Sequence, residues 1–186
     1  AACLVPFAAM VPVDADAADI MSALQITQEM GLGFNIGNSL DSTGYGNYDD
    51  ITSFEKSYGN PAVTKEMVDT IKAKGFDSVR IPTSWFRHVT KTTDENGNPV
   101  YTIDSRWLER VKEVVDYAYQ QGMYVILNLH HEEWINRSDF ATAYEEMSPQ
   151  LKQMWTQIAT YFADYDQHLI FEGMNEPRAA NSGALE

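Results

Sequence analysis

Residues 123–132, MYVILNLHHE, decide the fold of this chain. The run MYVILNL is almost entirely apolar, and it directly follows Gly122, a residue type that ends helices. A strand that is apolar on both faces is typical of a parallel sheet covered by helices, since both faces of such a sheet are buried. Asn128, His130 and His131 lie at its carboxyl end. The stretch therefore predicts a buried parallel strand with polar chemistry where it ends.

Strands and helices alternate on both sides of this stretch. Further strands are predicted in GFNIGNSLD (33–41), SVRIP (78–82) and LIFEGMN (169–175). Helices are predicted at about 19–30, from a Thr64 cap to Gly75, from an Asp104 cap to Gly122, and from Ser148 as N-cap with Pro149 in the first turn. A polar hairpin with Asn96-Gly97 as its turn is predicted between the second and third strands. This alternation predicts an α/β fold.

Two α/β architectures compete, the doubly wound sheet and the (β/α)8 TIM barrel. Gly33 and Gly37 do not have the G-x-G-x-x-G spacing, which disfavours a dinucleotide-binding sheet. Polar residues gather after successive strands, as expected where barrel strands converge on one mouth. They are Asn35, Asn38, Arg80, Trp85, Asn128, His130, His131, Asn175 and Glu176. A barrel needs eight strands and about 250 residues, so we expect this chain to supply roughly the first four βα units.

The chain has 186 residues, with 13 basic and 27 acidic side chains and a formal net charge of −14. Such a balance argues against a nucleic-acid partner, because phosphate binding needs a basic face. Cys3 is the single cysteine, which excludes an internal disulfide and a cysteine zinc site. No apolar run reaches membrane-spanning length, and no membrane partner is expected.

The first 18 residues are apolar and rich in small side chains, with an A-x-A-like site at Ala15-Asp16-Ala17. We predict that residues 1–18 are the remnant of a secretory signal peptide and that the protein is secreted. The alternative is a disordered tail. Residues 19–186 are then predicted to be the N-terminal half of the barrel domain.

Asn175-Glu176-Pro177 is the sharpest chemical signal. A glutamate at the mouth of a barrel can donate a proton if its pKa is raised, and a neighbouring asparagine can hydrogen-bond a substrate hydroxyl. The alternative is a solvated carboxylate at a strand end, and the spacing alone does not separate the two.

His130 and His131 admit three interpretations. Adjacent residues on a strand point to opposite faces, and H-E-x-x-H is absent, so no metal site is predicted. A hydrogen bond from at least one histidine to substrate is favoured over a histidine satisfied within the core.

Arg80 is a cation inside an apolar strand, so we expect it to face carboxylates. It either orients a catalytic glutamate or forms a structural pair with Glu172. Trp85 and Trp134 follow strand ends, where an exposed indole could stack on a sugar, whereas Trp107 and Trp155 lie on apolar helix faces and are predicted to be core residues.

Taken together, six segments in this order resemble glycoside hydrolase family 5, and more narrowly its subfamily 4 of endoglucanases and xyloglucan-active enzymes. The segments are GFNIGNSLD, SYGNPAVT, SVRIPTSW, YTIDSRWLERVKEVVDYA, YVILNLHHE and LIFEGMNEPR. The resemblance implies a (β/α)8 barrel and retaining, endo-acting hydrolysis of β-1,4-glucan without a cofactor. Xyloglucanase, mixed-linkage glucanase and mannanase are the alternatives within the family, and a non-catalytic carbohydrate-binding barrel is the alternative from another class.

The resemblance also implies roles for individual residues. Glu176 matches the general acid/base, and the nucleophilic glutamate belongs to a seventh strand that these residues do not include. The substrate-binding residues carried over are Asn175, Arg80, His130, His131, Asn35, Asn38 and Trp134. A β-glucan polysaccharide is the partner implied.

Overall fold

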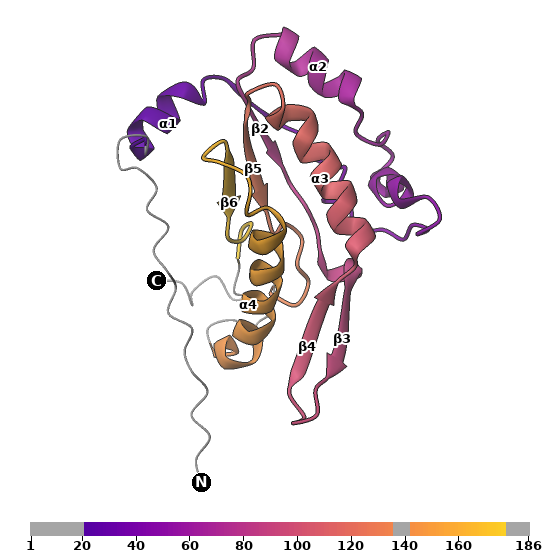
Figure 1. Ribbon diagram of the computed structural model, residues 1–186. Coiled ribbons are helices and arrows are strands. Elements are labelled where there is room, and N and C mark those ends of the chain that lie inside the picture. The colour runs from indigo at the N-terminus through magenta and orange to yellow at the C-terminus, as the bar shows by residue number, and fades with distance from the viewer. Residues whose placement is uncertain (1–20, 136–141, 178–186) are drawn as a thin grey trace.

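Four parallel strands form the central sheet of the computed structural model, which describes residues 21–135 and 142–177. The strands are β1 (Gly33–Asn35), β2 (Ser78–Ile81), β5 (Tyr124–Asn128) and β6 (Leu169–Glu172). Their order in the sheet is β1-β2-β5-β6, which is also their order in the chain (Figure 1). A doubly wound sheet would reverse this order at a switch point, so the topology favours a barrel segment.

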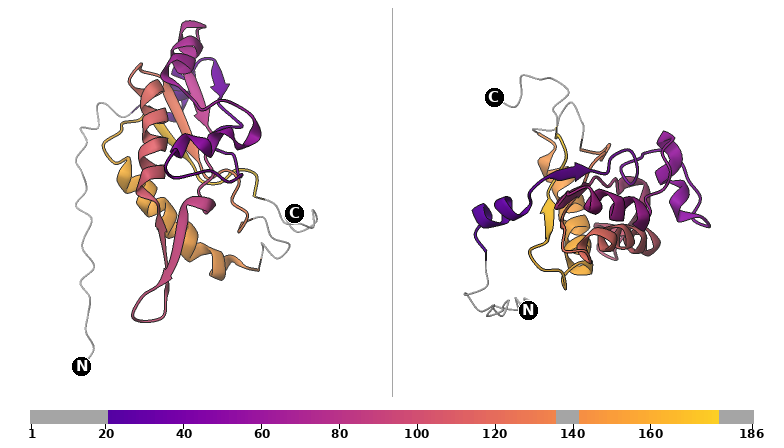
Figure 2. Two further views of the ribbon diagram at one scale, coloured as in Figure 1. Left: turned by 90° about the vertical axis from the view of Figure 1, so that its right-hand side faces the viewer. Right: turned by 90° about the horizontal axis from the view of Figure 1, so that it is seen from above.

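Four helices are present in the described residues: α1 (Ala23–Glu29) precedes the first strand, whereas α2 (Lys65–Ala73), α3 (Ser105–Tyr119) and α4 (Tyr144–Tyr161) connect the strands and lie on one side of the sheet (Figures 1 and 2). The short 3-10 turns are η1 (Ile51–Ser53), η2 (Glu55–Tyr58) and η3 (Phe86–His88). The predicted caps are confirmed, since Thr64 accepts from the backbone N–H of Met67 and Asp104 from that of Arg106. Each cap satisfies a helix N–H that has no partner inside the helix.

The core lies between the sheet and these helices. Alternate strand residues point toward α3 and α4, because successive side chains on a strand point to opposite faces. The buried cluster joins Val79, Ile81, Val125 and Leu127 of the strands to Val111, Val115 and Ala118 of α3 and to Met154 and Ile158 of α4. The opposite face of the sheet carries the polar residues described below.

A two-stranded hairpin projects from the end of the sheet at which β2 finishes (Figure 1). It consists of β3 (Val89–Thr93) and β4 (Pro99–Ile103), paired antiparallel. Gly97 has a φ of +84° in its turn, as predicted for a tight hairpin. The free edge of β4 is covered by α4, where Gln153 and Gln157 bond its backbone groups at 2.8–3.1 Å.

The prediction that Ser148 caps the last helix is wrong. This helix begins at Tyr144, one turn earlier, and Pro149 lies inside it. Glu145 and Glu146 fill its first turn, where negative charge is favoured by the helix dipole. Met147 and Ser148 are buried in this part of the helix.

No helix within residues 21–135 and 142–177 is long and apolar enough to cross a membrane. The predicted signal-peptide remnant, residues 1–18, lies outside the described residues.

Candidate active site

The register of the sheet places four polar side chains on the face turned away from the helices. Asn35 pairs with Arg80 across β1 and β2, and Asn128 pairs with Glu172 across β5 and β6. Arg80 pairs with Ile126, which is two residues before Asn128. Because residues two apart on a strand share a face, all four side chains line the surface that would form the interior of a barrel.

Arg80 is the centre of this polar face. Its guanidinium donates to both oxygens of Glu172, at 2.7 Å from Nε and 2.6 Å from Nη2. Nη2 also donates to Asn175 Oδ1 at 2.9 Å, and Nη1 donates to Asn35 Oδ1 at 3.2 Å. One side chain thus joins β1, β2, β6 and the loop after β6.

Arg80 was predicted either to form a structural pair with Glu172 or to orient a catalytic glutamate, and its contacts include elements of both. The bidentate pair with Glu172 is present, and its hydrogen bonds raise the pKa of Arg80 and lower the pKa of Glu172. The same guanidinium also holds Asn175, the residue before the candidate acid. The ion pair between Arg80 and Glu172 therefore supports the loop that carries Asn175 and Glu176.

Asn175 is orientated by this contact. An arginine can only donate, so the atom of Asn175 that faces it must be the oxygen, and the amide nitrogen faces elsewhere. Its backbone N–H donates to Leu129 O at 2.8 Å, which ties the loop after β6 to the loop after β5. The amide nitrogen of Asn175 is therefore the atom that could donate to a ligand hydroxyl.

Glu176 is exposed at the end of the same loop, with a φ of +41°. This left-handed conformation is uncommon for a residue with a side chain, and such conformations cluster at functional sites. Its charge is one of the smaller contributions that raise the pKa of Arg80, after the hydrogen bond that Arg80 donates to Glu172. The carboxyl group is thus both accessible and electrostatically coupled to the polar face.

Asn128 sets the tautomer of His130. Its Oδ1 accepts the backbone N–H of Thr83 at 3.1 Å, and its Nδ2 donates to Glu172 at 3.1 Å. The amide is therefore fixed, and it turns its nitrogen to His130 Nδ1, 3.2 Å away. Nδ1 must then accept, so the proton of the neutral imidazole is on Nε2. Asn128 was recognisable in the sequence as a polar strand end, but no local pattern indicates this role.

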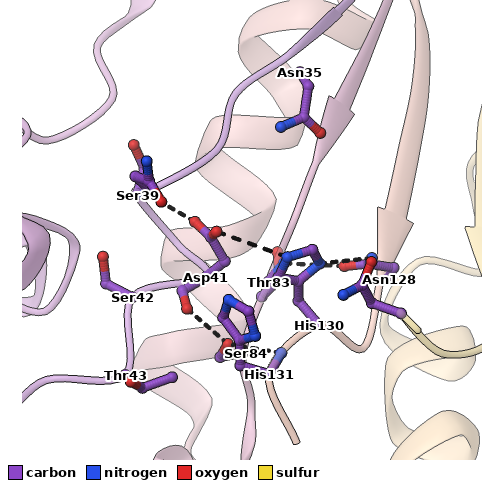
Figure 3. A network of polar contacts seen from close by, with 12 residues as sticks. Asn35, Ser39, Asp41, Ser42, Thr43, Thr83, Ser84, Asn128, His130 and His131 are labelled. Atoms are coloured by element: carbon purple, nitrogen blue, oxygen red, sulfur yellow. Dashed lines mark hydrogen bonds and ion pairs between the residues drawn. The ribbon is translucent and has the colours of Figure 1, made fainter. Parts of the chain in front are cut away.

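His130 is neutral in this setting. Burial, together with a smaller contribution from the neighbouring His131, lowers its pKa to about 4. Its Nε2 lies 3.8 Å from Asp41 Oδ2, beyond direct hydrogen-bonding distance (Figure 3). An uncharged Nε2–H therefore faces the site, where it can donate to a sugar oxygen.

Asp41 was missed as a site residue. It is buried, its Oδ1 accepts the backbone N–H of Ser39 at 2.7 Å, and its carbonyl accepts from Ser84 Oγ (Figure 3). The sequence shows only an aspartate at the end of a polar loop, and nothing in its local pattern indicates that the loop folds back to His130.

The prediction that the two histidines diverge is wrong. Strand β5 ends at Asn128, so His130 and His131 lie in the following loop, and their ring centroids are only 4.4 Å apart. One ligand atom from each of Asp41, His130 and His131 falls within 4.8 Å of the others. However, metal binding through His130 Nε2 would place the ring proton on Nδ1, against the amide donor of Asn128. The donor set therefore fits a metal ion poorly.

The four tryptophans divide differently from the prediction. Trp85 is fully buried, so it cannot stack on a sugar; its indole donates to Asn128 O at 2.8 Å. Trp134 is only partly buried and remains available. Trp107 is a core residue as predicted, and Trp155 packs against the core while partly exposed.

Two weaker predictions are placed at the rim. Asn35 is exposed and joins the network through Arg80. Asn38 is exposed, with a φ of +57°, and its carbonyl accepts from Asn60. The structure thus brings Arg80, Asn175, His130 and Asn35 together, and it does not draw the side chain of Asn38 into that network.

Comparison with known proteins agrees with this geometry. Residues 40–185 match the family model described as cellulase, glycosyl hydrolase family 5. The chain is 47% identical over 165 residues to endoglucanase A of Ruminococcus albus, with 87% of this chain and 42% of that protein covered. It is 46% identical over 172 residues to endoglucanase A of Clostridium longisporum, covering 90% and 31%.

Among solved structures, the chain is similar to a GH5-4 broad specificity endoglucanase from Ruminococcus flavefaciens. The two share 56% identity with a TM-score of 0.73, over 87% of this chain and 43% of the other. The chain thus spans less than half the length of each of these relatives. The likeness confirms the predicted fold, part of a (β/α)8 barrel.

Proposed function

This chain belongs to glycoside hydrolase family 5, and on that premise we propose that it is the part of a retaining endo-β-1,4-glucanase that carries the general acid/base, Glu176. The observation that supports this most is the Arg80 contact. By accepting from Arg80 at 2.9 Å, Asn175 turns its amide donor away from the guanidinium, while Glu176 follows it exposed at the strand end. A substrate hydroxyl and the glycosidic oxygen can then be met by adjacent residues.

Retaining hydrolysis needs two carboxyl groups about 5–5.5 Å apart, one as acid/base and one as nucleophile. Glu172 is the other glutamate at this strand end, but both of its oxygens accept from Arg80. Ion pairing keeps it anionic and weakens its nucleophilicity. We therefore assign the nucleophile to a later barrel strand outside these 186 residues, and expect no turnover from these residues alone.

A β-glucan chain is the proposed partner. His130 offers an uncharged N–H, Asn175 an amide, and Trp134 an apolar ring, and this mixture of donors and aromatic surface suits a neutral polyol. The net charge of −14 also suits a neutral polymer better than an anionic one. No cofactor is proposed for the reaction. Secretion is proposed from residues 1–18 alone.

The test is Glu176→Gln in the enzyme that contains this chain. We expect hydrolysis of soluble glucan to fall by about a thousandfold, because general acid assistance is lost. Aryl glycosides with activated leaving groups need no proton, so they should lose far less in the glycosylation step. Glu66→Gln, a matched change at an exposed position on α2, should leave both activities unaltered.

Equal loss on both kinds of substrate would overturn the assignment of Glu176. If the unaltered protein binds glucan but hydrolyses neither kind of substrate, it is a carbohydrate-binding barrel and the proposal fails. A panel of xyloglucan, mixed-linkage glucan and mannan then separates the alternatives within the family.

A further inference from the structure

Glu132 is a buried carboxylate that the proposed reaction does not use. Only 1% of the residue is exposed, in the loop that follows β5. Its Oε1 accepts the backbone N–H of Trp85 at 2.6 Å, and its Oε2 accepts the indole N–H of Trp134 at 2.7 Å. The backbone N–H of Phe86 also hydrogen-bonds to it. One side chain thus joins the loop after β2 to the loop after β5.

This carboxylate has only neutral donors among the described residues, and no cation pairs with it there. Burial raises its pKa to about 7, and the charge of the adjacent Glu133 adds to this effect, while the three N–H donors oppose it. Arg87, from the turn after β2, pairs with Glu133 at 3.8 Å instead. A buried, unpaired carboxylate is costly, so its retention calls for a specific benefit.

Trp134 is the only one of the four indoles whose N–H is held by a carboxyl group, and this group is ionised above its pKa of about 7. Trp85 and Trp155 donate to backbone carbonyl oxygens at 2.8 and 2.9 Å, and Trp107 Nε1 has no partner within the described residues. A charge-assisted hydrogen bond is about twice as strong as a neutral one. Trp134 packs against the core with one part of its ring, and the hydrogen bond to Glu132 fixes the orientation of its indole as well.

The held ring and the loop that carries the candidate acid line one cavity. Trp134 lines an apolar cavity of about 180 Å³ together with Tyr144, Met147, Leu151 and Met174. Met174 is two residues before Glu176 in the chain. The indole is therefore part of a surface that borders the loop carrying Asn175 and Glu176.

We propose that Glu132 is a positioning residue that holds the Trp134 indole as a binding platform for a sugar ring next to the reacting bond. This inference rests on the proposed function for its ligand class, a neutral β-glucan. Glu132 touches no substrate itself. It acts through the hydrogen bond to Trp134, so its loss should weaken binding before it slows chemistry.

A double-mutant cycle tests the role. In the enzyme that contains this chain, Glu132→Gln should raise KM for cello-oligosaccharides about fivefold, the equivalent of one net hydrogen bond, and change kcat by less than about twofold. Trp134→Phe keeps an apolar ring but removes the N–H. In that background Glu132→Gln should raise KM no further, because the coupling is already absent.

Glu133→Gln is the matched control. It removes the same charge one residue away, its side chain is 66% exposed, and it should leave KM unchanged. A merely structural Glu132 would lower the melting temperature and raise KM equally in both Trp134 backgrounds. That outcome, or a loss in kcat alone, overturns the proposal.

An NMR measurement judges the contact without any activity. In 15N-labelled protein, Glu132→Gln should move the indole N–H resonance of Trp134 upfield, while that of Trp155, which donates to a backbone carbonyl, stays in place. An unmoved Trp134 resonance overturns the proposal. If the resonance shifts but the protein hydrolyses no glucan, the proposed function has failed while the contact between Glu132 and Trp134 stands. In that case, cellotriose added to the unaltered protein should move the Trp134 resonance. No movement on adding cellotriose also overturns the platform role.

Discussion

Asn175 Oδ1 accepts a hydrogen bond from Arg80 Nη2 at 2.9 Å, which leaves the amide nitrogen of Asn175 as the only donor that side chain can offer to a ligand. The same arginine is bidentate on Glu172, so the contact is held from below by an ion pair. These contacts fix the orientation of an amide donor one residue before Glu176. They depend on the register of the strands that carry Arg80 and Glu172, and not on the loop alone.

Replacing that donor should slow the reaction without disturbing the ion pair between Arg80 and Glu172. Asn175→Asp can still accept from Arg80 but cannot donate, so we expect kcat/KM on glucan to fall at least about a hundredfold, since bonds to the sugar 2-hydroxyl strengthen in the transition state. Steady-state kinetics measure this. Asn96→Asp, the same change in the hairpin turn, is the control; equal activity of the two variants would contradict the role of Asn175.

The proton of His130 should follow the amide of Asn128. We expect 15N NMR to find the neutral Nε2–H tautomer at pH 7, with a pKa of about 4. Asn128→Asp still accepts from Thr83 but cannot donate to Nδ1, so it should raise this pKa and move the proton to Nδ1. An Nδ1–H tautomer in the unaltered protein would refute the assignment and would reopen metal binding by Asp41, His130 and His131.

The same pKa has a consequence for stability. Folding lowers the pKa of His130 from 6.5 to about 4, so between these values the unfolded chain binds more protons than the folded one. The contribution of neutral His130 is therefore complete above pH 6.5 and is lost as the pH falls toward 4.

The long loop between β1 and α2 should depend on one buried ion pair. Arg110 of α3 donates to both oxygens of Glu55 at 2.6 and 3.1 Å, and the two side chains are 4% and 0% exposed. Glu55→Ala removes the buried partner and leaves the guanidinium with only the half-exposed Glu113 as an ionic partner, so we expect it to lower the free energy of unfolding by about 3 kcal/mol.

The control for Glu55 is the exposed pair of Lys65 and Asp69 on α2, whose side chains are 59% and 45% exposed. Lys65→Ala should cost less than about 1 kcal/mol. Denaturant unfolding of both variants measures the difference, and a similar cost for the two would show that the buried pair does not anchor the loop.

Local signals predicted most of the fold. Thr64 and Asp104 were recognisable caps because each precedes an amphipathic run, and the apolar stretch 123–129 could only be a buried strand. The start of α4 was mistaken because Ser148-Pro149 is a good helix start in isolation, whereas packing of Met147 extends the helix by a turn. Local preference lost to tertiary burial there.

The sequence predicted those site residues that directly follow strand ends. It did not predict the contacts made by long loops that fold back over the site. Arg80, His130, Asn175 and Glu176 could be located because parallel strands bring their ends together. The burial of Trp85 and the meeting of Asp41 with His130 depend on how two long loops fold over each other, and the two histidines converge because β5 stops before them. The periodicity of apolar residues in the sequence does not predict these loop contacts.

The most direct test of the central claim is chemical rescue of Glu176→Ala in the enzyme that contains this chain, assayed on an activated aryl β-cellobioside with added azide. A retaining enzyme that has lost its acid/base still forms the glycosyl-enzyme, and azide can then attack it without general base assistance. We predict that azide restores turnover and that the product is the β-cellobiosyl azide. An α-cellobiosyl azide would identify Glu176 as the nucleophile, and either that product or the absence of rescue would contradict the account.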